Sequence, residues 1–216
     1  MAQRIIEDEG DVRKGLDHLT RKCALMREAH RIAGAPPHRR SVGGFEGLAR
    51  IIVAQQLSVA SANAIWDRLG RAVRPFEAGL FLKKREKTLR AAGLSGAKVR
   101  TLRGVATAIV AGDLEMAGLD SASDDEVLET LTALKGIGPW TADIYLMFAL
   151  GRADAFAAGD LALQNAAGML LESTVRPGPG ELLELAETWR PWRGVAARLL
   201  WAYYREIKQI NTGAPV

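Results

Sequence analysis

Apolar residues recur along this chain at intervals of three and four positions, which is the spacing of one face of an α-helix. No segment shows a convincing run of alternating β-branched residues, which would be typical of a strand. In the first helical segment, residues 11–33, the spacing places these residues on one face: Val12, Leu16, Leu19, Cys23 and Met26. The pattern predicts an all-α fold.

Glycine, proline and capping residues divide this pattern into separate helices. The predicted helices are 11–33, two within 45–73 with a break at 55–58, 85–92, 97–111, 123–134, 139–150, 160–172, one that begins at Pro179, and 191–208. Ser123 begins a capping-box pattern with Glu126, and Asp160 is placed to cap the helix that follows it.

Composition narrows the class of protein. With 216 residues, 48% of them hydrophobic, the chain is long enough to bury a core as one domain or two small lobes. The net charge of +4 is a mild basic excess, compatible with a nucleic-acid partner. The single cysteine, Cys23, excludes a disulfide framework, a cysteine-rich zinc site and a four-cysteine iron–sulfur cluster.

Neither a membrane nor a secretory signal is indicated. No apolar run is long enough to span a bilayer, and the N-terminus lacks the apolar core of a signal peptide. We therefore expect a cytoplasmic protein. The three histidines, His18, His30 and His38, form no metal-binding or triad pattern, and we expect them at the surface.

The segment from Leu134 to Asp143, with sequence Leu-Lys-Gly-Ile-Gly-Pro-Trp-Thr-Ala-Asp, carries the most informative local pattern. Gly136 and Gly138 bracket Ile137 between two predicted helices, which permits a tight turn with backbone N–H groups beside a helix N-terminus. Such a turn could bind one phosphodiester group of a nucleic acid through its backbone N–H groups, without contacting a base. The same turn also fits an ordinary helix connection. Trp140 immediately follows the turn, as a base-stacking aromatic or as a core residue.

Asp160 follows a run of small residues and precedes an apolar helix. An N-capping role alone explains an aspartate at this position. The offset from the hairpin also leaves room for one helix and a return loop, so the carboxylate can face a cleft that carries Trp140 on its other side. The two roles are compatible, because capping holds a carboxylate in place.

Three segments together resemble the helix-hairpin-helix DNA glycosylases, and within them the AlkA-type DNA-3-methyladenine glycosylases II. They are the segment 51–61, the block from Leu134 to Asp160, and the segment 189–201 with its Trp-Arg-Pro-Trp-Arg sequence. The resemblance spans roughly residues 45–208. It implies two helical lobes with an active-site cleft between them, which we place at 1–44 with 153–216 and at 45–152.

The resemblance also implies roles for individual residues. Asp160 matches the catalytic aspartate. Three aromatic residues match the base pocket: Trp140, Trp201 and Tyr145. The residues that match DNA-binding positions are Gly136, Ile137, Gly138, Thr141, Gln55, Gln56, Leu57 and Ser58. Either Gln56 or Leu57 matches the wedge that fills the gap left by a flipped nucleotide. Carbonyl oxygens of Thr132, Leu134 and Ile137 match a structural cation site for sodium, potassium or magnesium.

Departures from the family pattern refine the expected chemistry. Bifunctional relatives carry a Schiff-base lysine where this chain has Trp140, so we expect no strand-cleaving lyase activity. The long AlkA-type forms begin with a β-containing domain, which we do not expect here. We expect no cofactor in catalysis and no iron–sulfur cluster.

The resemblance therefore predicts a monofunctional glycosylase that flips and hydrolytically excises alkylated, cationic purines such as 3-methyladenine during base excision repair. Its partner is double-stranded DNA with damaged bases, and we expect a monomer. Two alternatives stay open: a glycosylase for deaminated or oxidised bases, and a non-catalytic helix-hairpin-helix DNA-binding protein.

Overall fold

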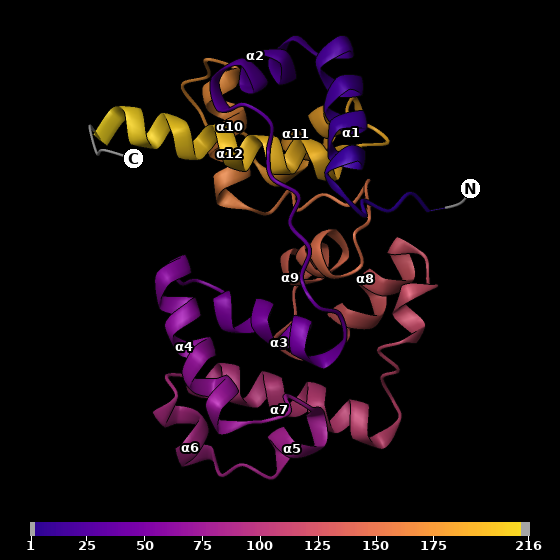
Figure 1. The fold of residues 1–216 in the computed structure, drawn as a ribbon, viewed down its shortest axis with the longest axis vertical. Coiled ribbons are helices and arrows are strands. Elements are labelled where there is room, and N and C mark those ends of the chain that lie inside the picture. Colours follow the sequence, from indigo (N-terminus) through magenta and orange to yellow (C-terminus); the bar gives the residue numbers. More distant parts are fainter. Residues whose placement is uncertain (1–2, 213–216) are drawn as a thin grey trace. The chain divides into compact units, whose positions relative to one another are not determined.

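The structure is a computed structural model that describes residues 3–212, and within this range it contains helices and no sheet (Figure 1). The α-helices are α1 Glu9–Lys22, α2 Ala24–Ala33, α3 Gly44–Ala54, α4 Val59–Ala72, α5 Ala78–Leu82, α6 Glu86–Ala91, α7 Gly96–Ala111, α8 Asp124–Thr132, α9 Pro139–Ile144, α10 Leu161–Leu170, α11 Pro179–Glu187 and α12 Arg193–Thr212. A 3₁₀ turn, η1, covers Gly118–Asp120, and a π-helical turn, η2, covers Tyr145–Ala149. The all-α prediction is confirmed.

The chain divides into two compact units. The first, here called the terminal unit, contains the described residues up to Arg40 and those from Gly151 on. The second, the central unit, is Ser41–Leu150. The sequence placed the corresponding boundaries after residues 44 and 152.

Helix α12 is the core of the terminal unit, where it packs against α10, α2 and α1 (Figure 1). Residues 194–200 are buried without interruption, so this part of the helix is covered on all sides: the apolar Val195, Ala196, Ala197, Leu199 and Leu200, and with them Arg198. Gly15 in α1 allows close packing here, since a Cβ at this position would lie 2.7 Å from Val195 Cγ2 and 2.8 Å from Trp192 Cε3. The side chain of Trp189, just before α12, is completely buried.

The central unit is built around α3 and α7. Helix α3 contacts α4, α7, α9 and η2, and α5 packs along α7. Phe45, Phe76 and Phe81 form an aromatic cluster with Trp66, in which the Phe45 and Phe76 rings stack 5.6 Å apart. This core holds α3, and with it the turn that follows α3.

The predicted helix boundaries that rest on local capping signals are confirmed. Ser123 and Glu126 form the capping box of α8, Asp160 caps α10, and α11 begins at Pro179. The break at 55–58 separates α3 from α4, with Ser58 as the N-cap of α4.

Three predicted helices differ from the structure, and one observed helix was not predicted. The single helix over 11–33 is wrong, because extended backbone at Cys23 separates α1 from α2. Helix α5 was not predicted. The helix over 139–150 changes from α to π geometry at Tyr145. The last helix begins at Arg193 rather than Pro191.

Within residues 3–212, no helix is both long enough and apolar enough to cross a membrane.

Two glycines offer a paired test of the packing around α12. A Cβ at Gly194 would lie 2.9 Å from the Ala153 carbonyl oxygen and 3.1 Å from that of Arg152, whereas a Cβ at Gly180 would contact nothing. We expect Gly194→Ala to lower the free energy of unfolding by about 1–3 kcal/mol, because backbone must move. Gly180→Ala, in exposed helix, should leave it unchanged or raise it by up to about 1 kcal/mol. Urea unfolding of both variants measures this difference, and equal effects would contradict it.

Candidate active site

Asp160 is the N-cap of α10 in the terminal unit. Its Oδ1 accepts the backbone N–H groups of Ala162 at 2.9 Å and Leu163 at 3.1 Å. A carboxylate at this position satisfies two helix N–H groups and interacts favourably with the helix dipole. The sequence of small residues followed by an apolar helix therefore folds locally so that this carboxylate is held, half-buried, at a helix start.

The indole of Trp201 makes a third bond to the same oxygen. Its Nε1–H donates to Asp160 Oδ1 over 3.0 Å from the middle of α12. A hydrogen bond to a carboxylate is stronger than one between neutral groups. Three N–H donors from two helices thus converge on one oxygen atom and fix the orientation of the carboxyl group. The sequence predicted an aromatic role for Trp201 and missed this polar one.

The loop before Asp160 is compact. The side chains from Ala155 to Ala158 are buried, and the Asp160 backbone N–H donates to the Ala157 carbonyl over 2.9 Å. The buried amide of Gln164, on α10, donates to the Ala158 carbonyl over 2.9 Å. The loop is therefore bonded back to the helix that it precedes.

In the central unit, the turn between α8 and α9 requires glycine at position 136, whereas Gly138 has extended backbone with a φ of −104° and open space around a Cβ. Gly136 has a φ of +91°, and a Cβ there would lie 2.1 Å from Thr101 Oγ1, so only glycine fits. Ile137 is buried and anchors the turn. Gly138 is the N-cap of α9, and Pro139 occupies its first turn.

The turn between α3 and α4 is bonded to α9. Gln55 Nε2 donates to Thr141 Oγ1 over 2.8 Å. Gln56, the next residue, has a φ of +57°, a left-handed conformation that strains residues other than glycine. Gln56 is exposed, and Leu57 is 40% exposed. The Gln55 side chain therefore binds within the central unit, whereas Gln56 and Leu57 lie at the surface.

Lys98 connects this turn to α7. Its ammonium group donates to the carbonyl oxygens of Val53 at 2.8 Å and Gln55 at 2.7 Å, at the C-terminal end of α3. A cation satisfies these terminal carbonyls and the negative end of the helix dipole. Burial lowers the pKa of Lys98. Thr101, one turn further along α7, packs against Gly136. One helix therefore fixes both the 55–58 turn and the hairpin.

The pattern of similarity to known proteins decides the family. A family model described as HhH-GPD superfamily base excision DNA repair protein matches residues 49–191. The chain belongs to this superfamily. The match includes the hairpin, Asp160 and the segment that leads into α12, so the resemblance drawn from the sequence is confirmed.

Individual HhH-GPD proteins are similar over most of the chain. DNA-3-methyladenine glycosylase 1 of Schizosaccharomyces pombe is 32% identical over 73% of this chain and 71% of its own length. The solved structure of an S. pombe 3-methyladenine DNA glycosylase in complex with abasic DNA has a TM-score of 0.81 at 28% identity, covering 87% of this chain and 95% of that one. A DNA-3-methyladenine glycosidase from Bacillus halodurans has a TM-score of 0.77 at 30% identity, covering 97% and 95%.

Two other predicted pocket residues lie on or beside α9. Trp140 is half-buried in the first turn of this helix. Tyr145 is completely buried, and its hydroxyl accepts the backbone N–H of Gly44 at 3.0 Å. Burial raises the pKa of this hydroxyl. Tyr145 thus holds the start of α3 and has no exposed surface for a base. Its pocket role, and the expectation that Trp140 faces Asp160, stay predictions.

The three histidines, which the sequence placed at the surface, are each half-buried. The Nε2 atoms of His18 and His38 are shielded from solvent and have no hydrogen-bond partner. Within residues 3–212, no three or more histidine, cysteine, aspartate or glutamate side chains gather in a way that would hold a metal ion.

The sequence missed Lys98 as a structural residue of the site, although a signal was present. Lys98 lies in the first turn of α7, where the helix dipole disfavours a cation. A lysine there indicates a specific acceptor elsewhere in the fold. The acceptor is the C-terminal end of α3. The sequence could not identify it, because the contact joins segments that are far apart along the chain.

Removing the Lys98 ammonium tests whether it holds the 55–58 turn. Lys98→Met keeps roughly the length of the side chain and removes both hydrogen bonds to the end of α3. We expect the free energy of unfolding to fall by about 1–2 kcal/mol and amide hydrogen exchange in residues 54–58 to accelerate. Lys87→Met, at an exposed lysine of α6, is the matched control. Equal exchange in the two variants would show that the turn does not depend on Lys98.

Proposed function

We propose that this protein is a monofunctional DNA glycosylase that extrudes alkylated, cationic purines such as 3-methyladenine from duplex DNA and removes them by hydrolysis. The observation that carries the proposal is the geometry of Asp160, whose carboxylate is fixed by two helix N–H groups and the Trp201 indole. Membership of the HhH-GPD superfamily and similarity to 3-methyladenine glycosylases support the substrate class.

Base extrusion precedes the chemistry, because the glycosidic bond of a stacked base is out of reach and unstacking costs a few kcal/mol. The hairpin turn at Gly136, Ile137 and Gly138 is proposed to hold the DNA backbone, whereas Thr141 is buried and its hydroxyl binds Gln55. The 55–58 turn is proposed to fill the vacated space. The strain at Gln56 supports this assignment, because glycine would adopt the same backbone without it.

Alkylation makes the purine both recognisable and easy to release. Its positive charge attracts the face of an indole by about 1–2 kcal/mol, a role that we propose for Trp201 and for Trp140. The glycosidic bond breaks with its electron pair leaving on the base, which departs neutral, and the positive charge moves to the sugar. Asp160 stabilises this charge and orients the water that adds to C1′ and loses a proton. The products are a free base and an abasic site.

The proposal includes a structural cation at the hairpin, bound by the carbonyl oxygens of Thr132, Leu134 and Ile137. The Leu134 carbonyl already accepts the Ile137 N–H over 3.1 Å, and a carbonyl oxygen has a second lone pair for a cation. No step of the reaction uses this ion. We further propose that the protein acts as a monomer in the compartment that contains the DNA.

Replacing the carboxylate tests the reaction. Asp160→Asn retains an oxygen for capping α10 and removes the charge. We expect release of 3-methyladenine from methylated duplex under single-turnover conditions to fall by about a hundredfold or more, with binding to abasic-site DNA retained. Release at the parental rate would exclude Asp160 as the catalytic group.

The same assay distinguishes the alternatives. Each lesion duplex is analysed with and without alkali, and strand cleavage without alkali would contradict a monofunctional enzyme. Excision of hypoxanthine or an oxidised base in preference to alkylated purines would favour the second enzyme class. DNA binding with no base release by the wild-type protein would indicate a binding protein.

The indole N–H of Trp201 can be removed without removing an aromatic face. We expect Trp201→Phe to slow base release about tenfold or more, because Asp160 Oδ1 loses the indole donor, while affinity for abasic-site DNA changes little. Trp201→Ala removes the face as well and should weaken recognition of alkylated bases further. Full activity of Trp201→Phe would show that the hydrogen bond does not contribute.

A further inference from the structure

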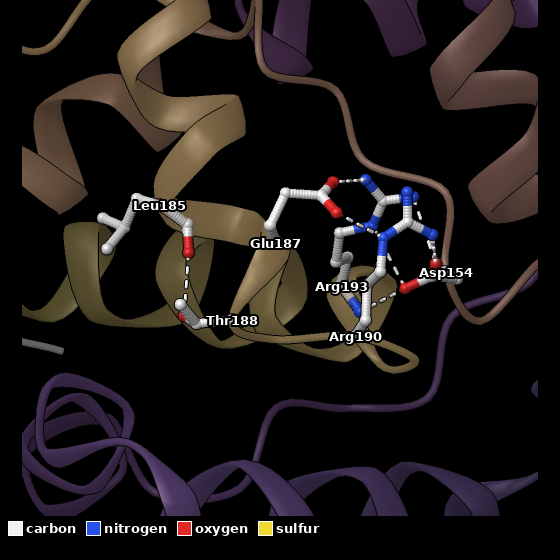
Figure 2. A network of polar contacts seen from close by, with 6 residues as sticks. All are labelled: Asp154, Leu185, Glu187, Thr188, Arg190 and Arg193. Carbon is white, nitrogen blue, oxygen red and sulfur yellow. Dashed lines mark hydrogen bonds and ion pairs between the residues drawn. The ribbon is translucent and has the colours of Figure 1, made fainter.

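The loop that leads to Asp160 is bonded at its beginning to the first turn of α12. Asp154 accepts the Arg193 Nε–H and one of its terminal N–H groups, each at 3.1 Å, and more weakly the Arg193 backbone N–H at 3.4 Å (Figure 2). The neighbouring Ala153 carbonyl accepts the Gly194 N–H over 2.8 Å. Residues 153 and 154 therefore cap α12 from outside the helix.

Figure 2 also shows how this ion pair is extended at the surface. Arg190 reaches Asp154 and donates through Nε to Glu187 over 2.7 Å, and Arg193 donates to Glu187 over 3.0 Å. The Arg193 side chain is only 13% exposed, whereas that of Glu187 is 51% exposed. The Glu187 carboxylate binds the two arginines on the exposed side of the network. The bond between Asp154 and Arg193 is thus the part of the network that reaches the loop from the protein interior.

The other end of the loop is bonded to the same helix. Asp160 Oδ1 accepts the indole N–H of Trp201, which lies eight residues beyond Arg193 on α12 and so about 12 Å along its axis. Between the two ends, Phe156 is buried edge-on against Trp189, with ring centroids 5.7 Å apart. The segment from Asp154 to Asp160 therefore spans two turns of α12 and is fixed at the start, in the middle and at the end.

We propose that Asp154 and Arg193 are positioning residues for Asp160: their ion pair sets where the loop begins on α12, and so sets the approach of the Asp160 carboxylate to Trp201. This inference rests on the proposed function. A salt bridge that only stabilised the unit would change unfolding without changing the bond between Asp160 and Trp201. A misplacement of about 1 Å at a reacting group lowers a rate about a hundredfold, so a small shift is measurable.

The decisive comparison uses two carboxylates of one network. Asp154→Asn and Glu187→Gln each remove one negative charge beside the same two arginines, but only Asp154 belongs to the loop. For Asp154→Asn we expect kcat for 3-methyladenine release to fall about 10- to 100-fold, with KM and affinity for abasic-site DNA unchanged. For Glu187→Gln we expect no more than about a twofold change. Equal losses in both variants would overturn the proposal.

A second readout does not depend on activity. The indole N–H signal of Trp201 is assigned in a ¹H–¹⁵N spectrum by its loss in Trp201→Phe. We expect this signal to shift, and its proton to exchange faster, in Asp154→Asn and not in Glu187→Gln. An unchanged Trp201 signal in Asp154→Asn overturns the positioning role, whatever the activity. If the wild-type protein releases no base but the signal moves, the proposed function is wrong and the control of Asp160 by Asp154 is supported.

Arg193→Lys tests the same ion pair from its other side and serves where Asp154→Asn does not fold. Lysine keeps the charge but loses the planar fork that binds Asp154 through two N–H groups. We expect a smaller shift of the Trp201 signal and a smaller loss of kcat than in Arg193→Gln. If both Arg193 variants retain the wild-type signal and rate, the proposal is wrong.

Discussion

The interaction on which the terminal unit depends is the convergence of three N–H donors on one oxygen of Asp160. Two of the donors belong to α10 and the third to α12, so the carboxylate connects two helices that pack against each other in this unit. Such a group cannot turn without losing all three bonds. The same hydrogen bonds therefore cap α10, connect α10 to α12 and hold the candidate catalytic carboxylate in place.

In the central unit, helix α7 holds two candidate DNA-binding segments in place. Helix α7 contributes Lys98 to the end of α3 and Thr101 to the hairpin, one helical turn apart. Gln55 closes the connection by donating to Thr141 on α9. The 55–58 turn and the hairpin are loops, and loops are ordinarily the mobile parts of a fold. Here both are bonded to rigid helices, which suits surfaces that must keep a fixed spacing.

The sequence predicted the parts of this arrangement that depend on neighbouring residues. Ser123, Gly136 and Asp160 each have a local conformation that their residue type favours, and the structure has those conformations. The break between α1 and α2 at Cys23 contains no glycine or proline. The apolar periodicity continues across it, so the sequence predicted one helix where the structure has two. The roles of Lys98 and Asp154 could not be predicted from the sequence for another reason. Their partners are 43 and 39 positions away along the chain, and only the packed fold brings them together.

The residue at position 140 explains why the placement of Asp160 matters so much in this chain. A lysine at the corresponding position in bifunctional relatives supplies a covalent nucleophile, which divides the reaction into two easier steps. Trp140 supplies no nucleophile, so under the proposed function water must attack the sugar directly. Under the same proposal Asp160 stabilises the developing positive charge, and electrostatic stabilisation is most effective where the stabilising group is already oriented. A carboxylate bound by three donors, on a loop bonded to α12 at both ends, meets that requirement before the substrate arrives.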